Sequence, residues 1–166
     1  MLLFVVGLLT FVICFWSLRS RSAVIFEVTT HGYGMVYPTS EVLDLRLCQN
    51  GRIEYDVYPP QGREFLNIHY WFPRHHSEVN STDFNELNRL IEQPDLLTAQ
   101  ERYKGSRPHI DDTWETTIRF HHGDATKQIV AINFWDDPND ATKYPPSMIA
   151  LLKRVSALRK NLTGRN

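Results

Sequence analysis

The stretch Val42–Tyr58 reads VLDLRLCQNGRIEYDVY and predicts a β-hairpin. Leucines alternate with charged residues over Val42–Cys48, and apolar residues alternate with polar ones over Arg52–Tyr58. Such a period of two is the pattern of a strand with one buried face. The dipeptide Asn50-Gly51 between the two runs is typical of a type I′ turn, which requires positive φ angles. We therefore expect two antiparallel strands joined by a tight turn.

Four more segments are expected to be strands because β-branched and aromatic residues are frequent in them. They are Ala23–Thr30, Phe65–Phe72, Thr113–Phe120 and Gln128–Trp135. The last of these is the most apolar, so we expect it to lie at the centre of the sheet. Arg102–Asp111 is polar and has no clear period, which predicts an irregular segment.

Two segments have the 3.6-residue period of amphipathic helices. The first begins at Ser81, Thr82 or Asp83, each of which is a good N-cap residue. Pro94 ends it or lets a second short turn start at Asp95–Gln100. Its apolar side chains share one face, formed by Phe84, Leu87, Leu90 and Ile91. The second begins near Ser147, and its apolar face is formed by Met148, Leu151, Leu152, Val155 and Leu158.

The expected order of elements is β-β-β-β-α-β-β-α, which predicts an α+β fold. A mainly antiparallel sheet of about five to six strands carries two amphipathic helices packed on one face, and an N-terminal hydrophobic helix precedes it. There is no internal repeat and no linker long enough to separate two domains. The chain therefore divides into an N-terminal membrane anchor or signal segment, residues 1–22, and a single α+β globular domain, residues 23–166.

Composition supports one globular domain. The chain has 166 residues, of which 42% are hydrophobic and 22% charged, and its formal net charge is -1. These values exclude a disordered chain and a disulfide scaffold, and they argue against a nucleic-acid-binding domain, which is usually strongly basic. Arg19 and Arg21 are the only charged side chains before Ala23, so the predicted domain itself is mildly acidic, at about -3.

Leu2–Trp16 reads LLFVVGLLTFVICFW and has no charged side chain. Extended to Leu18, a helix of this run is about 25 Å long, near the lower limit for crossing a bilayer core of about 30 Å. A cleaved signal peptide is one alternative, and a lipoprotein signal with Cys14 as the lipidated residue is another. We favour an uncleaved single-pass anchor whose membrane-embedded residues are Leu2, Leu3, Phe4, Val5, Val6, Leu8, Leu9, Phe11, Val12, Ile13, Phe15 and Trp16.

The side of the membrane on which the domain lies is a separate question. Arg19 and Arg21 follow the apolar run, and Lys and Arg are enriched on the cytoplasmic side of a span. Taken literally, this rule places the domain in the cytoplasm. Many short N-terminal anchors nevertheless translocate the domain that follows them, so two arginines do not fix the side.

Seven histidines include two adjacent pairs, His75-His76 and His121-His122. Neutral imidazole is a common metal ligand, so these four residues are the candidate metal ligands. Adjacent residues of a strand point to opposite faces, however, so one pair alone cannot easily chelate an ion from regular structure. No H-E-x-x-H, H-x-H or C-x-x-C motif accompanies the pairs, and solvated turn histidines are the alternative explanation.

The segment Glu101–His109 is the densest basic patch of the chain. Its three cations, Arg102, Lys104 and Arg107, are the candidate ligand-binding residues, and they favour an anion or a phosphate headgroup. A solvated loop is the alternative. The chain contains no G-x-S-x-G motif, no P-loop and no dinucleotide fingerprint. We therefore name no catalytic residue and expect no cofactor.

From Leu43 onward, the order of features resembles small bacterial domains of unknown function that follow a signal or an anchor. The features are a strand, the Asn50-Gly51 turn, the run RIEYD, the helix FNELNRLIEQPDL and the strand TWETTIRF. The resemblance covers roughly residues 42–158 and rests on fold-forming residues. It implies an architecture and an association with the cell envelope, and it supplies no catalytic residues.

Together these features predict a membrane-anchored, non-catalytic domain that binds a protein or another ligand at the cell envelope. The expected partners are the membrane, through the N-terminal helix, and a protein, but no nucleic acid. The alternative is a histidine-dependent metal-binding or hydrolytic domain. A periplasmic inhibitor or immunity-type module is a third hypothesis, which the sequence does not separate from the first.

Overall fold

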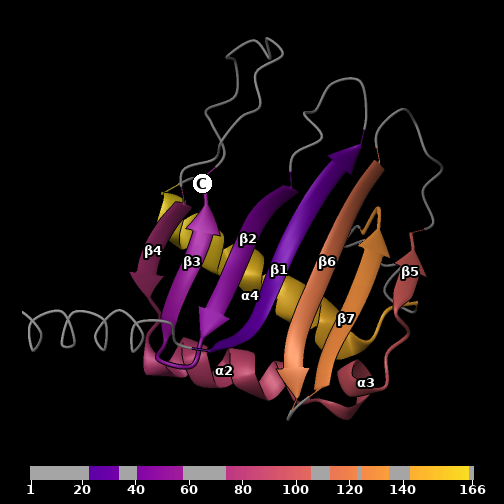
Figure 1. The fold of residues 1–166 in the computed structure, drawn as a ribbon, viewed down its shortest axis with the longest axis horizontal. Helices are drawn as coiled ribbons and strands as arrows, with labels where there is room; N and C mark the ends of the chain where they lie inside the picture. The colour runs from indigo at the N-terminus through magenta and orange to yellow at the C-terminus, as the bar shows by residue number, and fades with distance from the viewer. Residues whose placement is uncertain are drawn as a thin grey trace, which may run out of the picture.

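The computed structural model of the chain describes residues 23–33, 41–57, 74–105, 113–122, 125–134 and 143–164. These residues form an α+β fold, in which helices lie behind a seven-stranded sheet (Figure 1). In chain order the elements are β1 (Val24–Tyr33), β2 (Glu41–Cys48), β3 (Arg52–Asp56), β4 (Arg74–Glu78), α2 (Ser81–Ile91), α3 (Pro94–Leu97), β5 (Arg102–Lys104), β6 (Thr113–His122), β7 (Ala125–Ile132) and α4 (Pro146–Thr163). The predicted N-terminal helix and the predicted strand Phe65–Phe72 lie outside the described residues. None of the described helices is long and apolar enough to cross a membrane.

The strands lie in the order β4-β3-β2-β1-β6-β7-β5, so β1 is the central strand. All neighbouring strands are antiparallel except β5 and β7, which are parallel. The expectation that the apolar strand near the C-terminus would be central was wrong, because β7 lies next to the edge. The apolar character of β7 therefore does not come from a central position but from burial on both of its faces. Ile129 and Ala131 face the helices and are fully buried, while Val130 on the opposite face is only 8% exposed.

The sheet has seven strands rather than five to six because the sequence did not indicate its two edge strands. β4 is RHHSE, a run of polar residues without apolar alternation. β5 has three residues and lies within the segment that was expected to be irregular. At its end, Gly105 N–H donates to Ile132 O at 2.9 Å. A Cβ atom at Gly105 would lie 2.3 Å from Asn133 O, so this close approach to β7 requires glycine.

The predicted hairpin is confirmed as β2 and β3, but its turn differs from the expected type I′. A type I′ turn requires a positive φ at both Asn50 and Gly51. Gly51 has a φ of 80°, but Asn50 does not have a positive φ, because Asn133 is the only non-glycine residue of the described chain that does. The Gly51 N–H donates to Cys48 O at 3.0 Å. The loop is therefore three residues long, with Gly51 at the position that a type I turn with a bulge reserves for a left-handed residue.

The helices pack their apolar faces on one face of the sheet, as predicted. Leu87, Leu90 and Ile91 of α2 are buried, and so are four of the five apolar residues predicted for the last helix. The exception, Leu152, is partly buried against the core. The largest fully buried side chains are Phe26, Phe120, Leu45, Leu47, Ile53, Leu87, Leu96, Ile118, Ile129, Met148, Leu151 and Val28.

Ser147 does not cap the last helix. α4 begins one residue earlier, at Pro146, and its N-cap position is Pro145. The Ser147 N–H instead donates to Asp95 Oδ2 at 3.0 Å and so joins α4 to α3. Partial burial opposes the charge of Asp95, but hydrogen bonds from Ser147 and from nearby backbone N–H groups outweigh this and lower the pKa of Asp95.

The N-cap of α2 is Asn80, one residue before the three expected candidates. Its Oδ1 accepts from Asp83 N–H at 2.9 Å, and its Nδ2 donates to Asp83 Oδ2 at 2.9 Å. The prediction failed because Asp83 has another role. It is the third helical residue, where a carboxylate can bond back to the capping residue.

Replacing Asn80 with Ala should therefore lower the free energy of unfolding by about 1 kcal/mol, because the backbone N–H and the carboxylate of Asp83 both lose their partner. Urea denaturation followed by circular dichroism measures the change. Asn85→Ala on the exposed face of the same helix is the matched control and should cost nothing, since Ala favours helix. Equal destabilisation by both variants would contradict the assigned cap.

Candidate functional site

One cross-strand row of polar side chains runs over six strands of the open face, the face opposite the helices. The residues that flank the three central members along their strands, such as Phe26 and Val28, belong to the hydrophobic core. Each member lies opposite the next in the strand register. From β4 to β7 this ionic row consists of His76, Glu54, Arg46, Glu27, Arg119 and Gln128.

Glu27 on the central strand is the centre of the ionic row. Its Oε2 lies 2.9 Å from Arg46 Nη2, and its Oε1 accepts from Arg119 Nη1. Arg46 Nη1 also lies 3.0 Å from Glu54 Oε2. Burial disfavours the charged form of Arg46, but hydrogen bonds and attraction from Glu27 and Glu54 outweigh burial and raise the pKa of Arg46. Acids and bases thus alternate across the sheet and neutralise one another.

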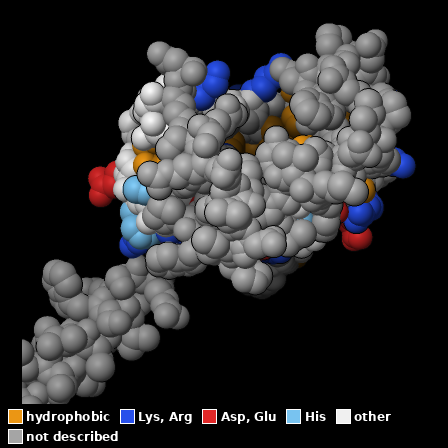
Figure 2. Space-filling view, turned by 90° about the horizontal axis from the view of Figure 1, so that it is seen from above, with side chains coloured by type: hydrophobic (Ala, Val, Ile, Leu, Met, Phe, Trp, Pro, Cys, Tyr) orange, Lys and Arg blue, Asp and Glu red, His pale blue; other side chains and the backbone are white. Residues whose placement is uncertain are grey.

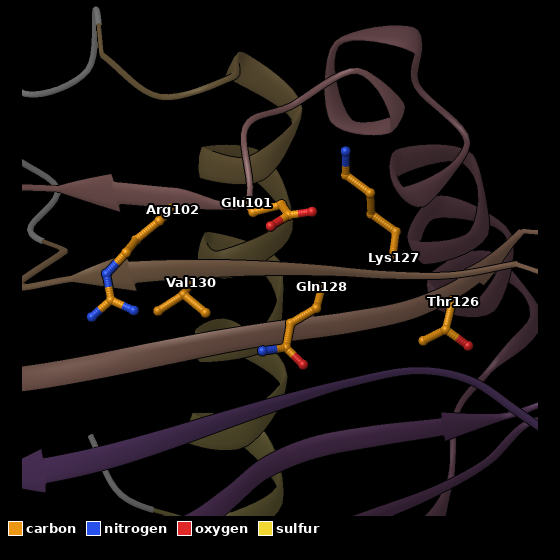
Figure 3. A pocket seen from close by; sticks show the side chains of 6 residues that line it. All are labelled: Glu101, Arg102, Thr126, Lys127, Gln128 and Val130. Atoms are coloured by element: carbon orange, nitrogen blue, oxygen red, sulfur yellow. The ribbon is translucent and has the colours of Figure 1, made fainter.

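A pocket of ≈ 430 Å³ opens at the β7 end of the ionic row (Figure 3). Thr126, Gln128 and Val130 line it from successive open-face positions of β7, and Lys127 points away from them. Glu101 and Arg102 complete the lining from the neighbouring edge. The pocket thus combines one apolar side chain, two neutral polar groups and charges of both signs.

The charged groups around the pocket differ in how strongly they are held. Lys127 Nζ donates to Ala99 O at 2.6 Å, so this cation is already engaged. Arg102 Nη2 lies 3.3 Å from Glu115 Oε2, but the Arg102 side chain is 62% exposed. An exposed ion pair is worth about 0–1 kcal/mol. Arg102 can therefore exchange its partner at little cost.

A second polar group lies where β2 and β3 diverge. Their pairing is regular at Arg46–Glu54 and Leu47–Ile53. The register of β1 with β2 shifts between Val28 and Thr29, which marks a β-bulge at Asp44. The bulge turns Asp44 toward α4, and only 8% of this residue is exposed. We call Asp44 and the nearby Asp56 of β3 the buried acid cluster.

Four partners compensate the two acids of the buried acid cluster. Asp44 accepts hydrogen bonds from Thr30 Oγ1 and from Arg159 Nη1. Asp56 Oδ2 accepts from the backbone N–H of Leu43 at 2.9 Å. Its Oδ1 accepts from Arg74 Nε at 3.2 Å, and its backbone oxygen accepts from Arg159 Nη2 at 2.9 Å. The Asp56 side chain thus joins β3 to β2 beyond the point where their ladder ends.

Burial raises the pKa of the Asp44 carboxyl, and the nearby Asp56 adds to this effect. The attraction of Arg159 and the hydrogen bonds from Thr30 and Arg159 act in the opposite direction. Among the described groups, Arg159 is therefore the one that most strongly favours the charged form of this buried carboxyl.

The structure places the two predicted histidine pairs far apart. His75 and His76 are neighbours on β4, where His75 stacks on Tyr55 with ring centroids 5.8 Å apart and His76 belongs to the ionic row. His121 is on β6, and its Nδ1 lies 3.0 Å from Thr126 Oγ1. The side chain of His122 lies outside the described residues. β4 and β6 are separated by four strand spacings, about 19 Å, so the structure does not bring the pairs together.

Within the described parts of the chain, no three His, Cys, Asp or Glu side chains lie close enough to hold a metal ion. Of the predicted basic ligand-binding residues, Arg102 lines the pocket and Lys104 is exposed two residues further along β5. Arg107 and the predicted membrane residues lie outside the described residues.

The ionic row was missed by sequence reasoning, although Arg46, Glu54 and Arg119 occupy polar positions of alternating strands. Alternation indicates which face such a residue occupies, but the register decides which charges become neighbours. Comparison with protein-family models and with curated proteins finds no match to this chain. The resemblance to envelope-associated bacterial domains therefore stays a prediction, and the function has to be argued from the geometry.

Replacing Arg159 with Met should lower the free energy of unfolding by about 3–5 kcal/mol near neutral pH, because Asp44 is left as an uncompensated buried charge. The loss should be smaller at pH 5 than at pH 8. The folded state already holds the Asp44 proton more tightly than the unfolded state does, and loss of the attraction of Arg159 raises the pKa of Asp44 further. The stability of the variant therefore falls more steeply than that of the wild type as the pH rises above the ordinary pKa of 3.8. Denaturant unfolding at both pH values measures this difference.

Two further variants test the cause of this loss. Adding Asp44→Asn to Arg159→Met should recover part of the stability and remove the pH dependence, since no ionisable group then remains at that position. Lys160→Met, at the neighbouring exposed position of α4, is the matched control. A loss in Arg159→Met that is independent of pH would contradict the role assigned to Asp44.

Proposed function

We propose that this chain is a membrane-anchored, non-catalytic binding domain, which recognises an anionic group of its ligand at the pocket between β5 and β7. The observation that carries this proposal is the position of Arg102. It is an exposed cation at the rim of a pocket, and its own ion pair with Glu115 is weak. A carboxylate or a phosphate of the ligand can take the place of Glu115 and accept two hydrogen bonds from the Arg102 guanidinium.

The neighbouring residues support the same ligand class. Lys104 lies two residues from Arg102 on β5 and is exposed, so alternation places a second cation on the same face of the edge strand. Gln128 and Thr126 supply neutral hydrogen-bonding groups, and Val130 supplies an apolar surface. An anionic group attached to a small apolar or polar body fits this combination.

The membrane part of the proposal rests on the sequence. The apolar run Leu2–Leu18 is followed by Arg19 and Arg21, and β1 begins at Val24. Only five residues separate the apolar run from the first strand, so an anchor formed by this run would hold the domain close to the bilayer. The ligand is then a component of the cell envelope, either a lipid headgroup or another molecule that carries an anionic group.

Titration of inorganic phosphate into the full chain in phosphatidylcholine nanodiscs, followed by calorimetry, tests the site. We expect Arg102→Gln to weaken phosphate binding about tenfold or more, because one charge-assisted hydrogen bond is worth about 1.5–3 kcal/mol. Arg89→Gln, at an exposed position of α2, is the matched control and should leave the affinity unchanged. Equal phosphate affinity in the wild type and in Arg102→Gln would refute the site.

A parallel titration in nanodiscs that contain phosphatidylglycerol identifies the source of the anionic group. If the lipid headgroup is the ligand, it occupies the site and the apparent phosphate affinity falls. If a free molecule is the ligand, the affinity is the same in both membranes.

The anchor is tested by extraction of membranes with alkaline carbonate, which releases proteins that do not span the bilayer. The wild-type chain should stay in the membrane pellet. Leu9→Arg places a charge at the middle of the apolar run at a cost of about 2.5–3.5 kcal/mol, so a larger fraction of this variant should be released. Ser20→Arg, after the run, is the control and should behave like the wild type. Release of the wild-type chain would disprove the anchor.

A further inference from the structure

β4 forms one edge of the sheet, and its outer side is exposed. Four of its five residues are exposed, and the side chains of Arg74 and His76 are 45% and 50% exposed. Within the described residues, β4 pairs only with β3. In the view from above, histidine and basic side chains gather on the flank where β4 lies in Figure 1 (Figure 2).

The hydrogen bonds of the sheet determine which backbone groups of β4 face outward. The Val79 N–H donates to Gly51 O at 3.0 Å, so position 79 bonds toward β3. In an antiparallel pair the bonding direction alternates along the strand. Positions 75 and 77 therefore also bond toward β3, while the N–H and C=O groups of Arg74, His76 and Glu78 point away from the sheet.

The sequence of this edge is complementary to itself. β4 reads RHHSE, and an antiparallel copy centred on His76 places Arg74 of one copy opposite Glu78 of the other. By symmetry the same contact forms twice, and the two His76 residues face each other. A parallel, in-register copy would instead place Arg74 opposite Arg74 and Glu78 opposite Glu78, which is unfavourable.

We propose that β4 is a dimerisation strand, through which two copies of this chain join their sheets edge to edge about a two-fold axis at His76. The backbone groups of Arg74, His76 and Glu78 form six hydrogen bonds between the copies. Two Arg74–Glu78 ion pairs fix the register. This inference rests on the edge alone and does not depend on the proposed ligand site.

Two features of Arg74 and His76 are compatible with this pairing. The Arg74 guanidinium is held by Asp56 through Nε, which leaves its terminal nitrogens for the second copy. His76 lies at one end of the ionic row. Because the two-fold axis is perpendicular to the sheet, the open faces of both copies lie on the same side. The two ionic rows then meet at His76 and form one continuous row.

Disulfide cross-linking in membranes tests the proposal with the full chain. Cys14 is replaced by Ala in every variant, so that the introduced thiol is the only one besides the buried Cys48. Hydrogen-bonded partners in an antiparallel pair have Cα atoms about 5.5 Å apart, which suits a disulfide. His76→Cys should therefore give a covalent dimer upon oxidation.

Ala125→Cys, at an exposed position of β7 five strand spacings from β4, is the matched control for cross-linking. It leaves both Arg74–Glu78 ion pairs in place, so it should not weaken the proposed dimer. This variant should give no covalent dimer upon oxidation. Equal cross-linking of both variants, or none of His76→Cys, would overturn the proposal.

Charge exchange tests the register independently. In Glu78→Arg or Arg74→Glu, both ion pairs of the homodimer become like-charge contacts, and dimer affinity should fall about tenfold in either variant. A mixture of the two variants restores opposite charges at both contacts, so a heterodimer should form with nearly wild-type affinity. Fluorescence energy transfer between differently labelled chains in nanodiscs measures this. If the two variants bind each other no more tightly than each variant binds itself, the register is wrong. Should Arg74→Glu fail to fold because Asp56 loses its partner, the cross-linking result decides.

Discussion

The contact between Arg159 and Asp44 joins the last helix to the place where the sheet departs from regular pairing. The bulge turns Asp44 into the interior, where a lone carboxylate would be costly. Arg159 provides the opposite charge and also donates to the backbone of β3. Because Asp56 in turn joins β2 to β3 and holds Arg74 of β4, the position of three strands depends on this one arginine. The end of α4 is therefore fixed by ionic contacts as well as by the apolar residues of its buried face.

The open face has a different organisation, because none of the described helices covers it. Its polar side chains alternate in charge, with Glu27 between Arg46 and Arg119. The charged side chains at the centre of the ionic row pair with one another. Arg102 and the outer side of β4 lie at the two edges of the sheet. The binding surfaces that we propose are these edges, where an ion pair is weak or, among the described residues, the backbone of β4 has no partner on its outer side. The centre of the sheet then serves as a stable support for both.

The features predicted from the sequence are those that depend on neighbours in the chain. The alternation in VLDLRLC and RIEYD indicated the hairpin, and the apolar spacing of α2 and α4 indicated which helix faces are buried. The features that were missed depend on distant partners. Glu27 and Arg119 are 92 residues apart, and Asp44 and Arg159 are 115 residues apart. β5 was missed because three polar residues become a strand only beside β7, and β4 because an exposed edge needs no apolar alternation. Arg102 could be named as a candidate because a cluster of cations is visible without knowledge of the fold, and its role in ligand binding stays a prediction.

The central position of β1 also determines when the sheet can be completed. β1 is the first of the described strands to leave the ribosome, and one of its edges is paired by β2 soon afterwards. Its other edge must wait for β6, whose Arg119 follows Glu27 by 92 residues. At about 5–20 residues per second, this delay lasts about 5–20 s. During that time an apolar strand with one open side lies next to a hydrophobic N-terminal segment. A nascent chain in this condition exposes apolar surface of the kind that chaperones bind, until its last strands are synthesised.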